Sequence, residues 1–161
     1  MESFYTGCAD AGPDRCAFWA PTPDDIRQNL TTIYDSIRIQ PVPVKSGNIY
    51  GYVDYTMLHS WIFFSLYSPF ATYRGLAQGL AELAAGNGIT VFNLASPPRF
   101  ECSEDSFKGL EQNGGEALIA ILCNDGVNIP ADLQSTQKHF EMMLNVSEFG
   151  HILANVRTQC V

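Results

Sequence analysis

The sequence predicts a mainly helical fold of about five helices with one short β-strand. Several segments carry apolar residues three and four positions apart, which places them on one face of a helix. Only one run, at 117–122, is short and continuously apolar in the manner of a buried strand. At 161 residues the chain has the length of a single domain with a core of its own.

The first helix is predicted from residue 22 to about residue 39. Thr22 offers a capping hydroxyl, Pro23 suits the first helical position, and the two acids that follow favour the positive end of the helix dipole. The apolar face is formed by Ile26, Leu30, Ile33, Tyr34 and Ile37. Gln40-Pro41-Val42-Pro43 ends the helix, because proline lacks the amide hydrogen and restricts the residue before it.

Two more helices are predicted, at 55–67 and at about 73–85. Asp54 is a candidate N-cap for the first of them, which is apolar on nearly every side and therefore either packs on several sides or lines a cleft. An extended connector is expected at 47–51. The second helix has its apolar face at Leu76, Leu80 and Leu83.

The predicted organisation of the whole chain is one domain, 1–161, made of five consecutive parts. The strand and its turn lie between an acidic surface loop and two amphipathic C-terminal helices. The parts are a disulfide-clipped loop at 1–21, a helical part at 22–100, the acidic loop at 101–116, the strand and turn at 117–126, and the C-terminal helices at 127–161.

Five cysteines allow two interpretations. In the first, Cys8–Cys16 clips a loop and Cys123–Cys160 ties the strand to the last helices, each bond stabilising the fold by about 2–4 kcal/mol. In the second, the thiols are free and buried, as in a cytosolic protein. Under the first interpretation Cys102 is left over, so it is free or its partner lies outside this chain.

Two sequons, at Asn29 and Asn145, are candidate N-glycosylation sites, which together with the cysteines are typical of secreted proteins. The first residues lack a basic region followed by an apolar one, so no signal peptide is expected in this chain. Secretory features without a signal favour a piece of a longer, extracellular protein.

The charge of the chain argues against two kinds of partner. Nine Lys and Arg residues against seventeen Asp and Glu give a net charge of −8, which repels both a phosphate backbone and an anionic membrane surface. The longest uncharged run, 55–73, contains a histidine, serines and a proline, so no membrane span is predicted. No nucleic-acid partner and no membrane partner are expected.

The sequence contains no complete catalytic or metal-binding motif. Gly-x-Ser-x-Gly, the phosphate-binding loop of nucleotide hydrolases and the dinucleotide fingerprint are all missing. His59, His139 and His151 lie far apart without metal-ligand spacing, and we interpret them as structural. We expect no catalytic residue, no metal and no cofactor in this chain.

Three residues are candidates for contact with a substrate, namely Asp125, Trp61 and Tyr67. Asp125 follows the predicted strand, where functional residues often project, although Asn124-Asp125-Gly126 also has the composition of an ordinary turn. Trp61 and Tyr67 belong to an aromatic stretch that lines an apolar cleft or packs in the core.

Five blocks of the chain, in this order, carry a resemblance to a known family. They are Cys8–Phe18, Val53–Leu58 through Leu66–Pro69, Leu76–Ala81, Glu116–Gly126, and Ser147–Gly150 through Arg157–Cys160. Together they resemble the cap region of secreted fungal and bacterial α/β-hydrolases of the tripeptidyl aminopeptidase-like serine peptidase family. The resemblance spans nearly the whole chain, which then corresponds to the helical cap subdomain of an α/β-hydrolase parent.

The resemblance implies a parent that hydrolyses peptide or ester bonds through a serine–histidine–acid triad and an oxyanion hole. In that family the serine precedes the cap and the acid and histidine follow it, so this chain resembles a fragment that is inactive alone. The cap would cover the site and select a peptide or ester substrate, with no partner protein implied. For an aminopeptidase parent, Asp125 is the first residue to test for binding of a cationic amino terminus.

Two alternatives remain open on the sequence. A small secreted binding or effector protein, helical and held by disulfides, would predict a signal peptide and an even number of cysteines. A stand-alone enzyme would require a catalytic constellation, and the sequence motifs supply none.

Overall fold

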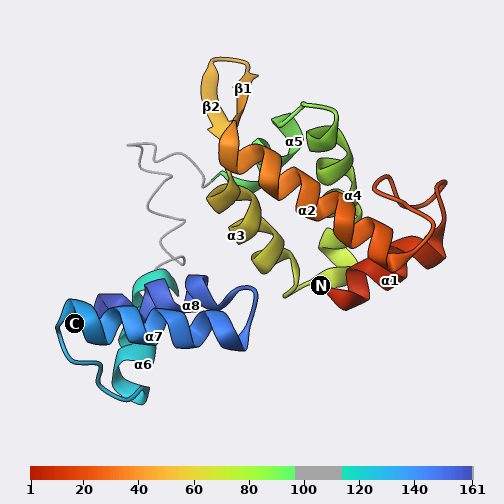
Figure 1. Ribbon diagram of the computed structural model, residues 1–161. Helices are drawn as coiled ribbons and strands as arrows, with labels where there is room; N and C mark the ends of the chain where they lie inside the picture. Colours follow the sequence, from red (N-terminus) through yellow and green to blue (C-terminus); the bar gives the residue numbers. More distant parts are fainter. Residues whose placement is uncertain (97–113, 161) are drawn as a thin grey trace. The chain divides into compact units, whose positions relative to one another are not determined.

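The computed structural model describes residues 1–96 and 114–160, which belong to two compact units (Figure 1). The internal contacts divide the chain into two units between residues 97 and 98. The sequence predicts a single domain. Both units are built mainly of helices, which confirms the mainly α class. The described part of the first unit has a core of its own, and the second is the smaller of the two.

The first unit contains five helices and a β-hairpin among its described residues. In Figure 1, α2 crosses the unit, α1 lies near the beginning of α2, and the hairpin lies at its end. The elements are α1 (Glu2–Ala11), α2 (Pro23–Ile39), β1 (Val42–Ser46), β2 (Ile49–Val53), α3 (Tyr55–Ser65), α4 (Pro69–Ala84) and α5 (Ile89–Ala95).

The second unit contains three helices in its described part. They are α6 (Gly114–Asp125), α7 (Leu133–Val146) and α8 (Gly150–Arg157), and a turn of 3₁₀ helix follows at Thr158–Cys160. Asp132 caps α7 by accepting the amide hydrogen of Ser135 at 2.8 Å. A Cβ atom at Gly150 would overlap the carbonyl group of Met143, so glycine lets α8 begin directly against α7.

The core of the first unit is formed by apolar side chains of α2, α3 and α4. The most deeply buried of these are Ile26, Leu58, Ile62, Leu76 and Leu80. The apolar face predicted for α2 is confirmed, since four of its five members are buried and Tyr34 is half-buried. Burial of such side chains is the main term that stabilises the unit.

Both N-caps predicted in this unit are present. The amide of Asp25 donates to the Thr22 hydroxyl at 3.2 Å, and the amide of Met57 donates to Asp54 Oδ1 at 2.8 Å. Each bond satisfies a donor that the first turn of a helix leaves without a partner. Pro69 begins α4, because proline is well suited to the first helical position.

The prediction of a strand at 117–122 was wrong, because this run belongs to α6. A short apolar run without alternation fits a buried helix as well as a buried strand, so periodicity could not separate them. The composition Ala-Leu-Ile-Ala-Ile-Leu contains two alanines and two leucines, which are strong helix formers. The premise that placed Asp125 at the end of a strand is therefore also wrong, since Asp125 is the last residue of a helix.

Two further elements were missed. Residues 2–11 of the predicted N-terminal loop form α1, which ends at Gly12 with φ +78°, a conformation that favours glycine. The expected connector at 47–51 is part of an antiparallel hairpin in which Val42 pairs with Val53 and Lys45 with Tyr50. Pro41 and Pro43 concealed this hairpin, because prolines argue against a strand unless it lies at a sheet edge.

Candidate functional site

One candidate binding site in the described part of the first unit is a groove between α3 and α5, which we call the Trp61 groove. Its volume is about 380 Å³. The side of α3 supplies most of its wall, and the last residues of α5 supply the rest. The lining residues are Asp54, Thr56, Met57, Ser60, Trp61, Phe64, Leu94 and Ala95.

The position of Trp61 depends on a glycine of the neighbouring helix. A Cβ atom at Gly79 of α4 would lie 2.8 Å from Trp61 Cη2, which is closer than real Cβ contacts come. It would also lie 3.2 Å from Val91 Cγ2, which is a tight contact. A side chain at this position would clash with the indole ring, so glycine is what allows Trp61 to pack against α4. Trp61 is half-buried, so part of its ring faces the groove while the rest is packed.

The polar groups of the groove lie along the first turns of α3. Asp54 is half-buried, and its Oδ1 atom is fixed by the amide of Met57. The carboxylate forms no ion pair with any residue of the described part of the chain. Thr56 and Ser60 lie one helical turn apart and line the same groove. Of the lining residues that the structure describes, Asp54 alone carries a charge.

A cluster of exposed aromatic residues lies at the end of α3 and the start of α4. Phe63 contacts Phe64 and Tyr67 edge to face, with ring centroids 5.4 and 5.5 Å apart. Phe64, Tyr67 and Phe70 are exposed, Tyr67 to 72%. Of the two interpretations of this aromatic stretch, core packing therefore does not hold for Phe64, Tyr67 and Phe70.

The structure distributes the three predicted substrate residues over different places. Trp61 lines the groove. Tyr67 belongs to the exposed aromatic cluster, with its ring centroid 6.4 Å from that of the groove residue Phe64. Asp125 is an exposed residue of the second unit, at the end of α6. Their roles in substrate binding stay predictions. The sequence did not single out Asp54 as a groove residue, although its position as N-cap of an apolar helix was the available signal.

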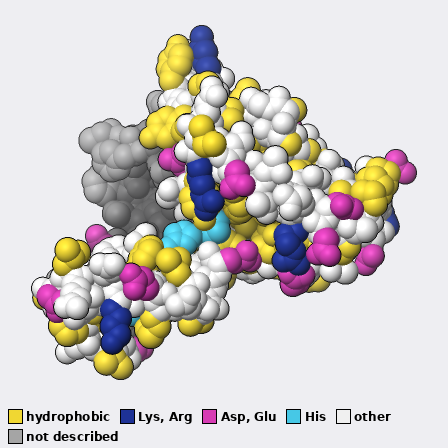
Figure 2. Space-filling view, in the orientation of Figure 1, with side chains coloured by type: hydrophobic (Ala, Val, Ile, Leu, Met, Phe, Trp, Pro, Cys, Tyr) yellow, Lys and Arg dark blue, Asp and Glu magenta, His cyan; other side chains and the backbone are white. Residues whose placement is uncertain are grey.

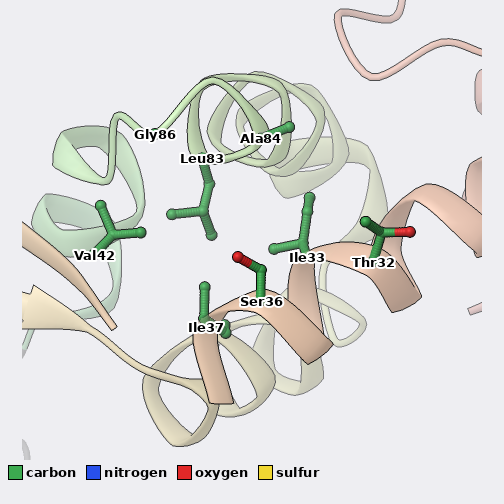
Figure 3. A pocket seen from close by; sticks show the side chains of 8 residues that line it. All are labelled: Thr32, Ile33, Ser36, Ile37, Val42, Leu83, Ala84 and Gly86. Atoms are coloured by element: carbon green, nitrogen blue, oxygen red, sulfur yellow. The ribbon is translucent and has the colours of Figure 1, made fainter. Parts of the chain in front are cut away.

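A second hollow of about 230 Å³ lies between α2, the end of α4 and β1 (Figure 3). In Figure 3, the side chains of Ile33, Ser36 and Ile37 from α2 face Leu83 and Val42 across it. Its walls are apolar except for the hydroxyls of Ser36 and Thr32. This composition suits packing of an apolar group and provides no charged group to orient a ligand.

His59 is buried in an aromatic cluster of the first unit. Its Nδ1 atom lies 3.0 Å from the hydroxyl of Tyr34, and the ring of Tyr55 stacks on it with centroids 5.0 Å apart. The guanidinium of Arg38 covers Tyr55 at 4.1 Å. These contacts agree with a structural role for this histidine.

On α8, burial lowers the pKa of His151.

The two disulfide bonds of the first cysteine interpretation are confirmed. Cys8 and Cys16 are bonded, with Cα atoms 5.3 Å apart, and Cys123 and Cys160 are bonded, with Cα atoms 5.2 Å apart. Their interpretation as free thiols was therefore wrong. Cys102 and most of the predicted acidic loop, 101–113, lie outside the described residues.

Both sequons are on helices. Asn29 lies on α2 and Asn145 on α7, and both side chains are exposed. Their glycosylation stays a prediction.

In residues 1–96 and 114–160, no group of three His, Cys, Asp or Glu residues gathers to hold a metal ion. Among the same residues, no helix is both long enough and apolar enough to cross a membrane. Comparison with protein-family models, with curated proteins and with solved structures finds no match for this chain.

Proposed function

We propose that this chain is the substrate-covering cap of a secreted serine hydrolase that resembles the tripeptidyl aminopeptidase-like family, and that the triad is supplied by a separate catalytic core. The parent would hydrolyse peptide or ester bonds of substrates with a free amino terminus. The cap would close over the reactive serine, exclude water and select the substrate. Its own residues would perform no chemical step.

The observation that carries this proposal is the amount of apolar surface that the helices leave uncovered. In the described part of the second unit only Phe149 and Ala154 are buried apolar side chains. Many others are exposed: Leu118, Ile121, Val127, Leu133, Met142, Leu144, Val146 and Leu153. Figure 2 shows hydrophobic side chains on the visible face of this unit. Surface of this kind marks an interaction site, and a cap buries such surface against its catalytic core.

The first unit supports the proposal in a second way. Its Trp61 groove and exposed aromatic cluster present apolar rings that a peptide side chain can contact. The two disulfides agree with an oxidising, extracellular compartment. An acidic chain with net charge −8 also attracts a cationic amino terminus.

The test is reconstitution with a capless core of a hydrolase of that family that carries the triad. We expect the chain alone to bind a hydrophobic dye and to be inactive. Addition of the core should displace the dye, give a calorimetric binding signal and produce hydrolysis of aminoacyl-4-nitroanilides. Changing Leu118→Glu together with Ile121→Glu should weaken binding about tenfold or more, because central apolar contacts dominate interfaces.

A matched control places two glutamates at exposed polar positions of α7, Gln134→Glu and Asn145→Glu. This control should bind the core as the wild type does. In the reconstituted enzyme, Asp125→Asn should slow hydrolysis of free-amino peptides more than that of amino-blocked ones. A chain that binds no core and leaves the dye unbound would contradict the proposal, and equal loss on both peptides would remove Asp125 from it.

The second candidate function is that of a small secreted helical binding or effector protein. The two disulfides favour it weakly, because they are frequent in small secreted domains. It predicts a chain that is monomeric, binds no hydrophobic dye and has no affinity for the core. The same dye measurement therefore separates the two candidates.

A further inference from the structure

We propose that the Trp61 groove binds a primary ammonium group carried on an apolar, preferably aromatic, body. The ammonium would pair with the free oxygen of the Asp54 carboxylate, and the apolar body would lie along Trp61 and Phe64. This inference concerns the chain alone and requires no hydrolase core. It can therefore fail while the proposed function holds, and the reverse is also true.

The charge of the groove selects a cation. Among the described residues that line the groove, Asp54 is the only charged one, and it forms no ion pair with another described residue. One carboxylate oxygen accepts the amide of Met57, which holds the group in place while leaving Oδ2 for a ligand. A half-buried carboxylate binds a cation more strongly than a fully exposed one, because water screens the pair less.

The kind of cation follows from the remaining polar groups. Thr56 and Ser60 line the groove one helical turn apart on α3, and each carries a hydroxyl group. An ammonium group has three donors, and a carboxylate with two hydroxyls offers acceptors for all of them. A metal ion would require more oxygen ligands than this groove contains.

The other wall of the groove determines the body of the ligand. Trp61, Phe64, Met57 and Leu94 are apolar, and Phe64 and Leu94 are 63% and 56% exposed. Gly79 leaves room for the Trp61 ring to pack against α4, so the ring is in place before a ligand arrives. Indole also attracts a cation over its face, which adds to the pairing with Asp54.

The experiment uses the full chain and three probes of similar size, namely 2-phenylethylammonium, 2-phenylethanol and 3-phenylpropionate. The chain has two tryptophans, so Trp19→Phe leaves Trp61 as the only tryptophan reporter. We expect the ammonium probe to change Trp61 fluorescence saturably. It should bind about fivefold or more tightly than the alcohol, as a charge-assisted hydrogen bond provides, and the carboxylate probe should bind least.

The decisive variant is Asp54→Asn, whose amide oxygen can still cap α3, and circular dichroism checks that the helix content is kept. It should bind the ammonium and the alcohol equally. Asp132→Asn makes the same change at the N-cap of α7, outside the groove, and should keep the wild-type preference. Added NaCl should weaken binding of the ammonium to the wild type and leave the alcohol unaffected.

Three results would each overturn the inference. They are equal affinity for the three probes, a preference for the ammonium that survives in Asp54→Asn, and a fluorescence change that does not saturate. The salt dependence is measured on the wild type, so the inference stays testable if Asp54→Asn fails to fold. Salt-independent binding of the ammonium would also contradict it.

Discussion

Two glycines on α4 show how one missing side chain decides a local structure. Gly79 faces α3 and α5, where a Cβ atom would lie 2.8 Å from Trp61 Cη2. Gly75, one turn earlier, has only Leu94 Cδ1 nearby, at an ordinary contact distance of 3.7 Å. The same substitution at the two positions therefore has opposite consequences for the free energy of unfolding.

Gly75→Ala should stabilise the first unit by about 0.5–1 kcal/mol, the usual gain of alanine over glycine inside a helix. Gly79→Ala should destabilise it by about 1 kcal/mol, because overpacking typically costs about 1–3 kcal/mol and outweighs that gain. Urea unfolding followed by circular dichroism measures both. If Gly79→Ala proved the more stable of the two, the close packing of Trp61 would be wrong.

For single residues, the sequence predicted roles that depend on residues nearby in the chain, such as helix caps. It missed roles that depend on residues distant in the chain. The caps at Thr22 and Asp54 follow from residue type at a helix start, and both are present. The role of Gly79 depends on the meeting of three helices, so local sequence holds no sign of it. For the same reason the aromatic stretch pointed to a cleft without naming Asp54 as part of it.

At the scale of the elements, the carboxylate of Glu82 links α4 to α5 through a hydrogen bond. Gln78 Nε2 donates to Glu82 Oε1 and Thr90 Oγ1 donates to Glu82 Oε2, both at 2.6 Å. The hydrogen bond from Gln78, followed by that from Thr90, lowers the pKa of Glu82 below its ordinary value of 4.5. A carboxyl with a lower pKa in the folded state stabilises the fold above pH 4.5, and this contribution is lost as the pH falls through the folded pKa.

Thr90→Val removes one of these donors, so the pKa of Glu82 should rise towards 4.5 and the acid dependence of stability should shrink. An NMR titration of the Glu82 carboxyl measures the pKa, and unfolding at several pH values measures the stability. Thr6→Val, at an exposed position of α1, provides the control. An unchanged titration in Thr90→Val would show that the bond to α5 is not maintained in solution.

The sequence predicted well those elements that have one buried face and one exposed face. α2 has such a pattern, and its bounds and buried face agree with the prediction. α6 has a continuous apolar run, which left helix and strand equally acceptable. The hairpin pairs residues across a two-residue connection, yet its prolines argued against strands.

Considered as a whole, the molecule combines a unit with a substantial core and a unit with little buried apolar surface. The described first unit buries apolar side chains on α1 to α5, whereas residues 114–160 bury only Phe149 and Ala154. The disulfide Cys123–Cys160 connects α6 to the end of the chain in that second unit. Its stability in isolation should therefore depend on this bond far more than the first unit depends on Cys8–Cys16.

The double variant Cys123→Ser with Cys160→Ser should unfold the second unit. A disulfide closing such a loop contributes about 2–4 kcal/mol, and the few buried apolar side chains of this unit do not make up for that loss. Hydrogen exchange followed by mass spectrometry should show lost protection in α6, α7 and α8 with protection kept in the first unit. Cys8→Ser with Cys16→Ser should lower the stability of the first unit and leave it folded. Full protection of α7 without its disulfide would contradict this view.

The hairpin has a consequence for aggregation. In the hairpin each strand is paired on one side only within the described sheet, and an unpaired strand edge is a template for another strand. β1 carries Pro43, which lacks an amide donor, and Lys45, which brings a charge, and both features discourage strand addition. β2 has the uncharged sequence Ile-Tyr-Gly-Tyr-Val and neither protection. At high concentration, fibrillar stacking between copies should therefore start from the edge of β2.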